Sequence, residues 1–174
     1  MKSYFIQAAA YNRWANGRLY EAAFGLEDRD LRRDVGAFFR SLHGTLNHVL
    51  VADRIWLWRL TGEGPQPDRL DAIVHEDLGD LAQARADEDD RLAAYVGGLL
   101  SSEVEAMHEF TTLAGTRFTQ SRRDILAHVF NHQTHHRGQA HTILSILTGA
   151  EPPPLDLLMF QRGVEAPDLR QLGR

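Results

Sequence analysis

The stretch SRRDILAHVFNHQTHHRGQAHTILSILTG, residues 121–149, decides the fold. Its apolar residues recur at intervals of three and four, which is the spacing of an amphipathic helix. Ser121 can cap the helix, with Asp124 three residues later, and Gly149 provides a stop after about Leu147. The sequence therefore predicts one long helix that carries most of the chain's histidines.

Working outward, three further segments have helical spacing. They cover residues 3–24, closed by Gly25, residues 41–61, opened by Ser41, and residues 78–100. Residues 26–40 are predicted to be a loop with a short helical turn, and residues 66–78 have the composition of a linker. Four long helices with little strand predict an all-α fold, an up-and-down four-helix bundle in a single domain spanning residues 1–174.

Two smaller elements complete this prediction. Residues 110–119 have the pattern of a short hairpin that joins the third and fourth long helices. After Pro152-Pro153-Pro154, a short C-terminal helix over residues 155–161 is expected to pack back through its apolar side chains. These side chains are Leu157, Leu158 and Phe160.

Composition excludes several classes of protein. The 174 residues contain no cysteine, which rules out a disulfide scaffold, a thiol nucleophile and a cysteine-ligated zinc or iron–sulfur site. A net charge of -5 argues against nucleic acid as a partner. There is no apolar run of 18 residues and no clear signal peptide, so we expect no membrane span and a cytoplasmic location. The acidic run Glu88-Asp89-Asp90 is predicted to be a solvated face.

Nine histidines are present, and five of them lie between residues 128 and 141. At about 100° per residue, His132 and His136 lie roughly 40° apart on the apolar stripe of their helix. His128 and His135 fall at the edge of that stripe, and His141 points outward. Residues four apart on a helix can reach one metal ion, so His132 and His136 are candidate ligands.

A third histidine, His48, lies on the segment 41–61, which is apolar almost all round. Facing helices of a bundle build metal sites in its core. Three protein ligands with one open position are typical of a catalytic zinc-type site. We therefore predict that His48, His132 and His136 bind a metal. The alternative is that they are core histidines hydrogen-bonded to polar neighbours or to water.

Two other metal sites fit the sequence poorly. Residues 132–136 have the spacing of the HExxH metalloprotease motif, but Gln133 stands where the catalytic glutamate is needed. A di-iron bundle needs two Glu-x-x-His motifs, and only Glu105 to His108 has that spacing.

Several neighbours of the three histidines have two interpretations each. Gln139 points inward and could orient a ligand or substrate, or it could simply pack, whereas Arg137 points away from the stripe. His128 is the best fourth ligand if the metal is structural. The three tryptophans line either a pocket mouth or the core; they are Trp14, Trp56 and Trp58.

The chain resembles the DinB superfamily of bacterial four-helix-bundle proteins. Three segments carry the resemblance: YNRWANGRL at residues 11–19, LNHVLVADRIWL at 46–57 and HVFNHQTHHRGQ at 128–139. One position departs from the family pattern, since Asp53 stands where glutamate is more usual. The resemblance implies a metal triad at His48, His132 and His136. It also implies a divalent metal, zinc or nickel before manganese or iron, and a homodimer.

Characterised relatives include mycothiol-dependent isomerases and thiol S-transferases, so the resemblance implies a low-molecular-weight thiol as a cofactor and a small-molecule substrate. Metal coordination lowers the pKa of a thiol or water and makes it a nucleophile near neutral pH. Because the chain has no cysteine, the sulfur must come from outside. The sequence leaves two alternatives open, a metal-hydroxide hydrolase and a dimeric metal- or ligand-binding module without turnover.

Overall fold

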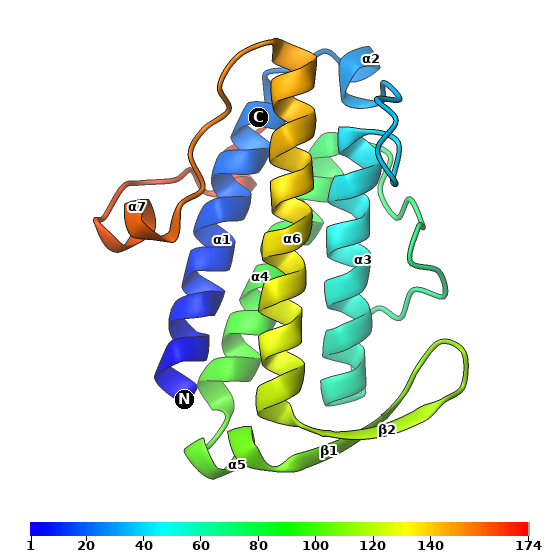
Figure 1. Ribbon diagram of the computed structural model, residues 1–174, viewed down its shortest axis with the longest axis vertical. Helices are drawn as coiled ribbons and strands as arrows, with labels where there is room; N and C mark the ends of the chain where they lie inside the picture. Colours follow the sequence, from blue (N-terminus) through cyan, green and yellow to red (C-terminus); the bar gives the residue numbers. More distant parts are fainter. Residues whose placement is uncertain (174) are drawn as a thin grey trace.

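A computed structural model describes residues 1–173 and shows a bundle of four long helices (Figure 1). These are α1 (Lys2–Phe24), α3 (Leu42–Thr61), α4 (Leu78–Gly98) and α6 (Arg122–Thr148). The short elements are α2 (Asp28–Leu31), α5 (Ser101–Glu105), β1 (Met107–Thr111), β2 (Arg117–Ser121), α7 (Leu157–Gln161) and η1 (Leu169–Gln171). The predicted helical bundle is confirmed.

The connection between α3 and α4 sets the direction of these two helices. Residues 62–77 return along the length of α3, so α4 begins near the start of α3 and the two run in the same direction (Figure 1). Ion pairs between them follow this parallel order, from Asp53 with Arg85 to Arg54 with Glu88. The bundle is as predicted but the up-and-down order is not, because helical periodicity reveals element lengths and not this long crossover, which we call the strap (residues 62–77).

Local capping defines the helix ends. The side chain of Ser41 accepts a hydrogen bond from the Gly44 N–H at the start of α3, and Ser121 accepts one from Asp124 N–H at the start of α6. Gly149 ends α6 with a φ of 66°, a left-handed conformation that glycine adopts without strain. Both predicted serine caps are confirmed.

The hairpin is also confirmed, as an antiparallel pair in which Phe110 lies opposite Phe118. The short helices α5 and η1 were not expected from the sequence. The prediction for α7 is wrong in part, because Leu157 and Leu158 are 43% and 51% exposed. Only Phe160 packs back, with its ring against Tyr11 and Trp14 of α1.

The apolar core has two parts separated by a polar layer. One part includes Leu46, Leu50 and Leu144, and the other includes Phe5, Leu92 and Leu126. Between them lie buried polar side chains from all four long helices: Asn12, Asn16, Asp53, Arg85, Asp89, Gln133 and Arg137. We call these seven residues the ionic layer.

The ionic layer overturns two predictions from the sequence. Glu88 and Asp89 are each 2% exposed, so the acidic run is not a solvated face. Asp89 accepts hydrogen bonds from Asn12 and Asn16 and pairs with Arg85. Arg137 is 2% exposed and donates to Asn12 and Gln133. A helical wheel with one inward stripe misses this, because α6 has α1 on one side and α3 on the other.

Within residues 1–173, the helices are all too short or too polar to span a membrane.

Candidate metal centre

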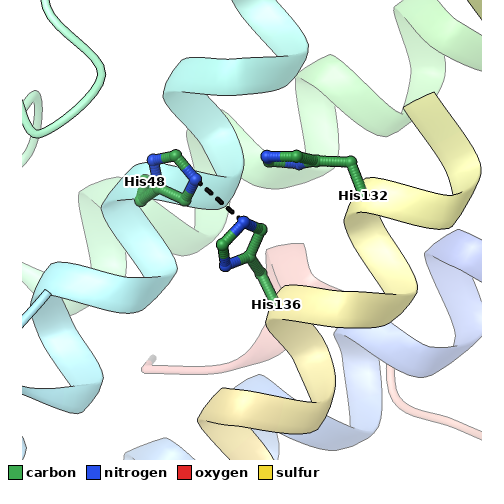
Figure 2. Close-up of side chains that lie close together, drawn as sticks. All are labelled: His48, His132 and His136. Carbon is green, nitrogen blue, oxygen red and sulfur yellow. Dashed lines mark hydrogen bonds between the residues drawn. The ribbon is translucent and has the colours of Figure 1, made fainter. Parts of the chain in front are cut away.

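Helices α3 and α6 bring His48, His132 and His136 together (Figure 2). One ring nitrogen from each residue lies within 4.8 Å of the others. His48 and His136 are buried, and His132 is half-buried. The three histidines that helical spacing selected therefore do converge in the folded chain.

Hydrogen bonds assign the tautomers of two of these rings. His48 Nδ1 lies 2.7 Å from the Leu70 carbonyl oxygen, which can only accept, so Nδ1 carries the proton. His136 Nδ1 lies 2.7 Å from Gln139 Oε1, which also accepts. If both rings are neutral, each Nε2 therefore presents a lone pair.

These two lone pairs face each other, since His48 Nε2 and His136 Nε2 lie 3.2 Å apart (Figure 2). A hydrogen bond between them requires an additional proton on one ring. Burial opposes that proton: it lowers the pKa of His48, and together with the other histidines it lowers the pKa of His132 to about 3. Burial also lowers the pKa of His136 to about 4.

A cation resolves this arrangement without protonating any ring. Neutral imidazole is a common metal ligand. Two nitrogens bound to one tetrahedral zinc at 2.0–2.1 Å lie about 3.4 Å apart, which is close to the observed 3.2 Å. The three-histidine set thus fits a divalent metal in charge, in donor type and in the spacing of its closest pair.

An aromatic ring from the loop before α3 covers the site. Phe39 stacks on His48 with ring centroids 3.8 Å apart and meets His136 edge-on at 5.7 Å. The loop lies so close to α3 that a Cβ at position 44 would come within 2.2 Å of the Phe39 carbonyl oxygen. Glycine at position 44 therefore allows Phe39 to reach the histidines.

The residues predicted to lie near the three histidines differ in where the structure places them. Gln139 does face the site, where its Oε1 accepts from His136. His128 is exposed, with its ring 5.8 Å from that of His132, and it is outside the group of three. Its ring instead meets that of Trp56, with the centroids 5.0 Å apart.

The other tryptophans and Asp53 belong elsewhere in the molecule. Trp14 is buried and donates from Nε1 to the Val164 carbonyl. Of the two interpretations for this tryptophan, the structure therefore favours a place in the core. Trp58 is half-buried. Asp53, at the position that departs from the family pattern, pairs with Arg85 at 2.8 Å in the ionic layer.

Two contributors to the site were missed from the sequence. The Leu70 carbonyl is a backbone group, so no side-chain pattern reveals it. Phe39 lies in a segment predicted only as a loop, and the signal available was an aromatic pair, Phe38-Phe39, directly before the Ser41 cap.

Comparison with known proteins shows which family the chain belongs to. The model of the DinB family matches residues 1–168. The chain belongs to the DinB family. A crystal structure of a DinB-like protein from Bacillus cereus superposes with a TM-score of 0.66 at 21% identity, covering 86% of this chain and 94% of that one. At this identity the likeness shows the fold. No curated protein matches the chain in sequence.

Proposed function

We propose that this DinB-family protein is a metal-dependent enzyme that activates a low-molecular-weight thiol for transfer to a small electrophile. One observation carries the proposal: two buried neutral imidazoles direct their lone pairs at each other, with a third beside them. A divalent metal at His48, His132 and His136 would lower the pKa of a coordinated thiol. The absence of cysteine from the chain supports a thiol supplied from outside.

The chain's own residues prepare the site for this chemistry. The Leu70 carbonyl and the Gln139 amide oxygen hold the rings of His48 and His136 with Nε2 facing the common centre. Such outer partners fix ring orientation and raise ligand basicity. Phe39 covers the His48 ring and excludes water from that side.

Metal content is the first test. The protein is purified without a histidine tag, analysed for metals, stripped with a chelator and titrated with zinc and with nickel. We expect about one ion per chain. We also expect zinc at 100 times its Kd to stabilise the fold by about 2.7 kcal/mol. Full metal retention in His48→Ala, His132→Ala and His136→Ala would exclude this site.

Turnover is the second test. The zinc- and nickel-loaded proteins are incubated with a panel of low-molecular-weight thiols and an electrophilic acceptor. The loss of free thiol measures the reaction. Thiol consumption that disappears in His132→Ala supports the proposal. Ester or amide hydrolysis with no thiol dependence would indicate a metal-hydroxide hydrolase instead. Metal binding with no turnover of either kind would indicate a binding module.

A further inference from the structure

The strap contacts one of the three clustered histidines, His48, through a backbone carbonyl. It has no regular secondary structure over most of its length, yet its Leu70 carbonyl accepts the hydrogen bond that places the proton on His48 Nδ1. Leu70 itself is 53% exposed, so its side chain does not anchor this carbonyl in the core. Something else must hold the strap in register with α3.

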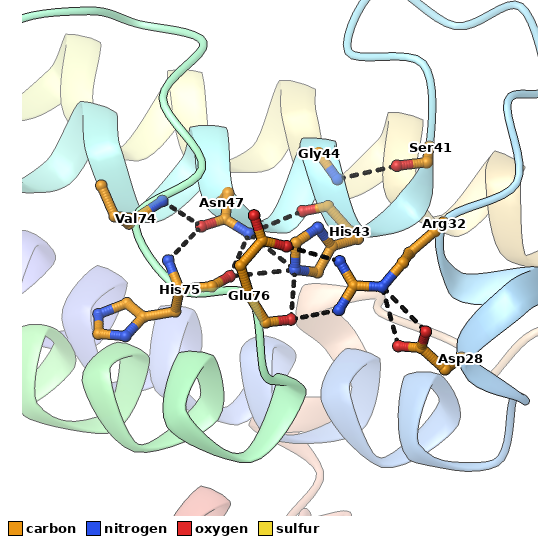
Figure 3. Close-up of polar contacts among 9 residues, drawn as sticks. All are labelled: Asp28, Arg32, Ser41, His43, Gly44, Asn47, Val74, His75 and Glu76. Carbon is orange, nitrogen blue, oxygen red and sulfur yellow. Dashed lines mark hydrogen bonds and ion pairs between the residues drawn. The ribbon is translucent and has the colours of Figure 1, made fainter.

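Asn47, the residue directly before His48, provides that anchor (Figure 3). Its Oδ1 accepts from the backbone N–H groups of Val74 and His75 at 2.9 and 3.1 Å. Its Nδ2 donates to the backbone carbonyls of His75 and His43, each at 3.1 Å. Asn47 itself is fully buried, so its amide atoms are shielded from solvent.

Two further side chains strengthen the same attachment (Figure 3). His43 is 3% exposed, and its Nε2 lies 3.0 Å from the carbonyl oxygens of both His75 and Glu76. Arg32 donates to the Glu76 carbonyl at 2.5 Å and to its carboxylate at 2.8 Å. We call Asn47, His43 and Arg32 the clasp.

Two of the three clasp residues lie on the same short piece of helix as His48. His43, Asn47 and His48 all lie in the first two turns of α3. The clasp fixes residues 74–76, and the strap then runs only four residues to the Leu70 carbonyl at His48. Movement of the strap therefore changes the partner of His48 Nδ1 directly.

We propose that Asn47 is a positioning residue for the metal centre: it holds the strap so that the Leu70 carbonyl keeps His48 in the Nδ1–H tautomer with Nε2 free to bind. The role in metal binding rests on the proposed function, but the tautomer is a property of the metal-free protein. Loss of an outer partner of a ligand histidine costs about 10–100-fold in metal affinity.

The test combines zinc affinity with NMR of the ¹⁵N-labelled imidazoles in metal-free protein. Wild type is expected to show His48 protonated at Nδ1. In Asn47→Ala we expect His48 to lose this preference and zinc affinity to fall about 10–100-fold. His43→Phe keeps an aromatic ring but removes both ring nitrogens, including the Nε2 that lies 3.0 Å from the strap carbonyls, so a smaller shift in the same direction is expected. It also serves as the test variant if Asn47→Ala does not fold.

Two controls separate positioning from general destabilisation. Arg69→Ala removes an exposed ion pair with Asp71 within the strap and should change neither readout. Leu92→Ala weakens the distant part of the core and should lower stability without changing the His48 tautomer.

Three results would overturn the inference: a wild-type His48 protonated at Nε2, clasp variants with an unchanged tautomer, or an equal loss of zinc affinity in Leu92→Ala. If wild type binds no zinc, the proposed function fails, and the NMR comparison alone still decides whether the clasp sets the tautomer.

Discussion

The bundle interior holds two polar clusters, of which one finds its partners within the chain and the other does not. The ionic layer pairs buried cations with buried anions, as where Arg85 lies 2.8 Å from Asp53 and 3.1 Å from Asp89. Arg137 joins it through the neutral side chains of Asn12 and Gln133. The histidine cluster contains no anion, and two of its nitrogens meet lone pair to lone pair.

This difference teaches how to distinguish a structural polar cluster from a binding site. A buried charge is tolerated when partners within the chain compensate it, and the ionic layer meets that condition in charge, since Arg85 lies between Asp53 and Asp89. The histidine cluster carries no charge of its own, and its two facing lone pairs gain a partner only when a cation is added. The clusters adjoin along α6, where Gln133 donates to Asp53 in one and His132 and His136 belong to the other.

The largest expected effect comes from breaking the ionic layer. Arg85→Met leaves Asp53 and Asp89 buried without their cation, which should destabilise the fold by about 3–5 kcal/mol. Urea unfolding measures this loss. Arg123→Met, which removes an exposed partner of Glu105, is the matched control and should cost less than about 1 kcal/mol. A comparable cost in the two variants would mean that the layer is not a structural requirement.

Removing a ligand from the histidine cluster should strongly lower zinc affinity and have little effect on the stability of the metal-free fold. His132→Ala should lower zinc affinity by more than the roughly 10–100-fold expected for an outer partner. In metal-free protein it should change the free energy of unfolding by no more than about 1 kcal/mol. Zinc titration and urea unfolding of the same samples check both parts. A large loss of metal-free stability would instead assign His132 a structural role.

The two clusters should also contribute differently to the pH dependence of stability. The pKa of His132 is lowered to about 3 and that of His136 to about 4, from an ordinary value of about 6.5. Between pH 6.5 and 4 the unfolded chain therefore binds protons that the folded chain does not. The linkage relation then gives a stability that falls as pH is lowered from about 7 to 4.

The ionic layer contributes with the opposite sign in the same range, because burial raises the pKa of Asp53 to about 6. This contribution is present in both wild type and His132→Ala, so the difference between their stability–pH curves isolates His132. We expect the wild-type curve, measured with chelator, to fall more steeply toward pH 4. Parallel curves would contradict a neutral, buried His132.

The smallest expected effect is a gain at Gly138, which lies mid-helix in α6. A Cβ built there meets nothing within 4 Å, so no close helix contact requires glycine. Gly138→Ala should stabilise the fold by about 0.5–1 kcal/mol, measured by urea unfolding, with zinc affinity unchanged. A loss of affinity would show that the cluster depends on local flexibility of α6.

Much of this organisation could be predicted from residues alone. Ser121 and Gly149 mark the ends of α6, and the four-residue spacing of His132 and His136 puts them on one helix face. The burial of the charged side chains could not be predicted in the same way. Asp89 and Arg137 have the composition of a solvated surface, and nothing local shows that each finds buried partners on other helices.

The sequence by itself determined the long helices, the hairpin and the identity of the three convergent histidines, because helical period and capping are local properties of the chain. Only the tertiary structure decided that α3 and α4 run in parallel and that the strap brings its Leu70 carbonyl to His48. It also decided that a backbone carbonyl orients His48. These features depend on which distant segments meet, and a backbone carbonyl is the same at every residue, so no pattern of side chains encodes its position.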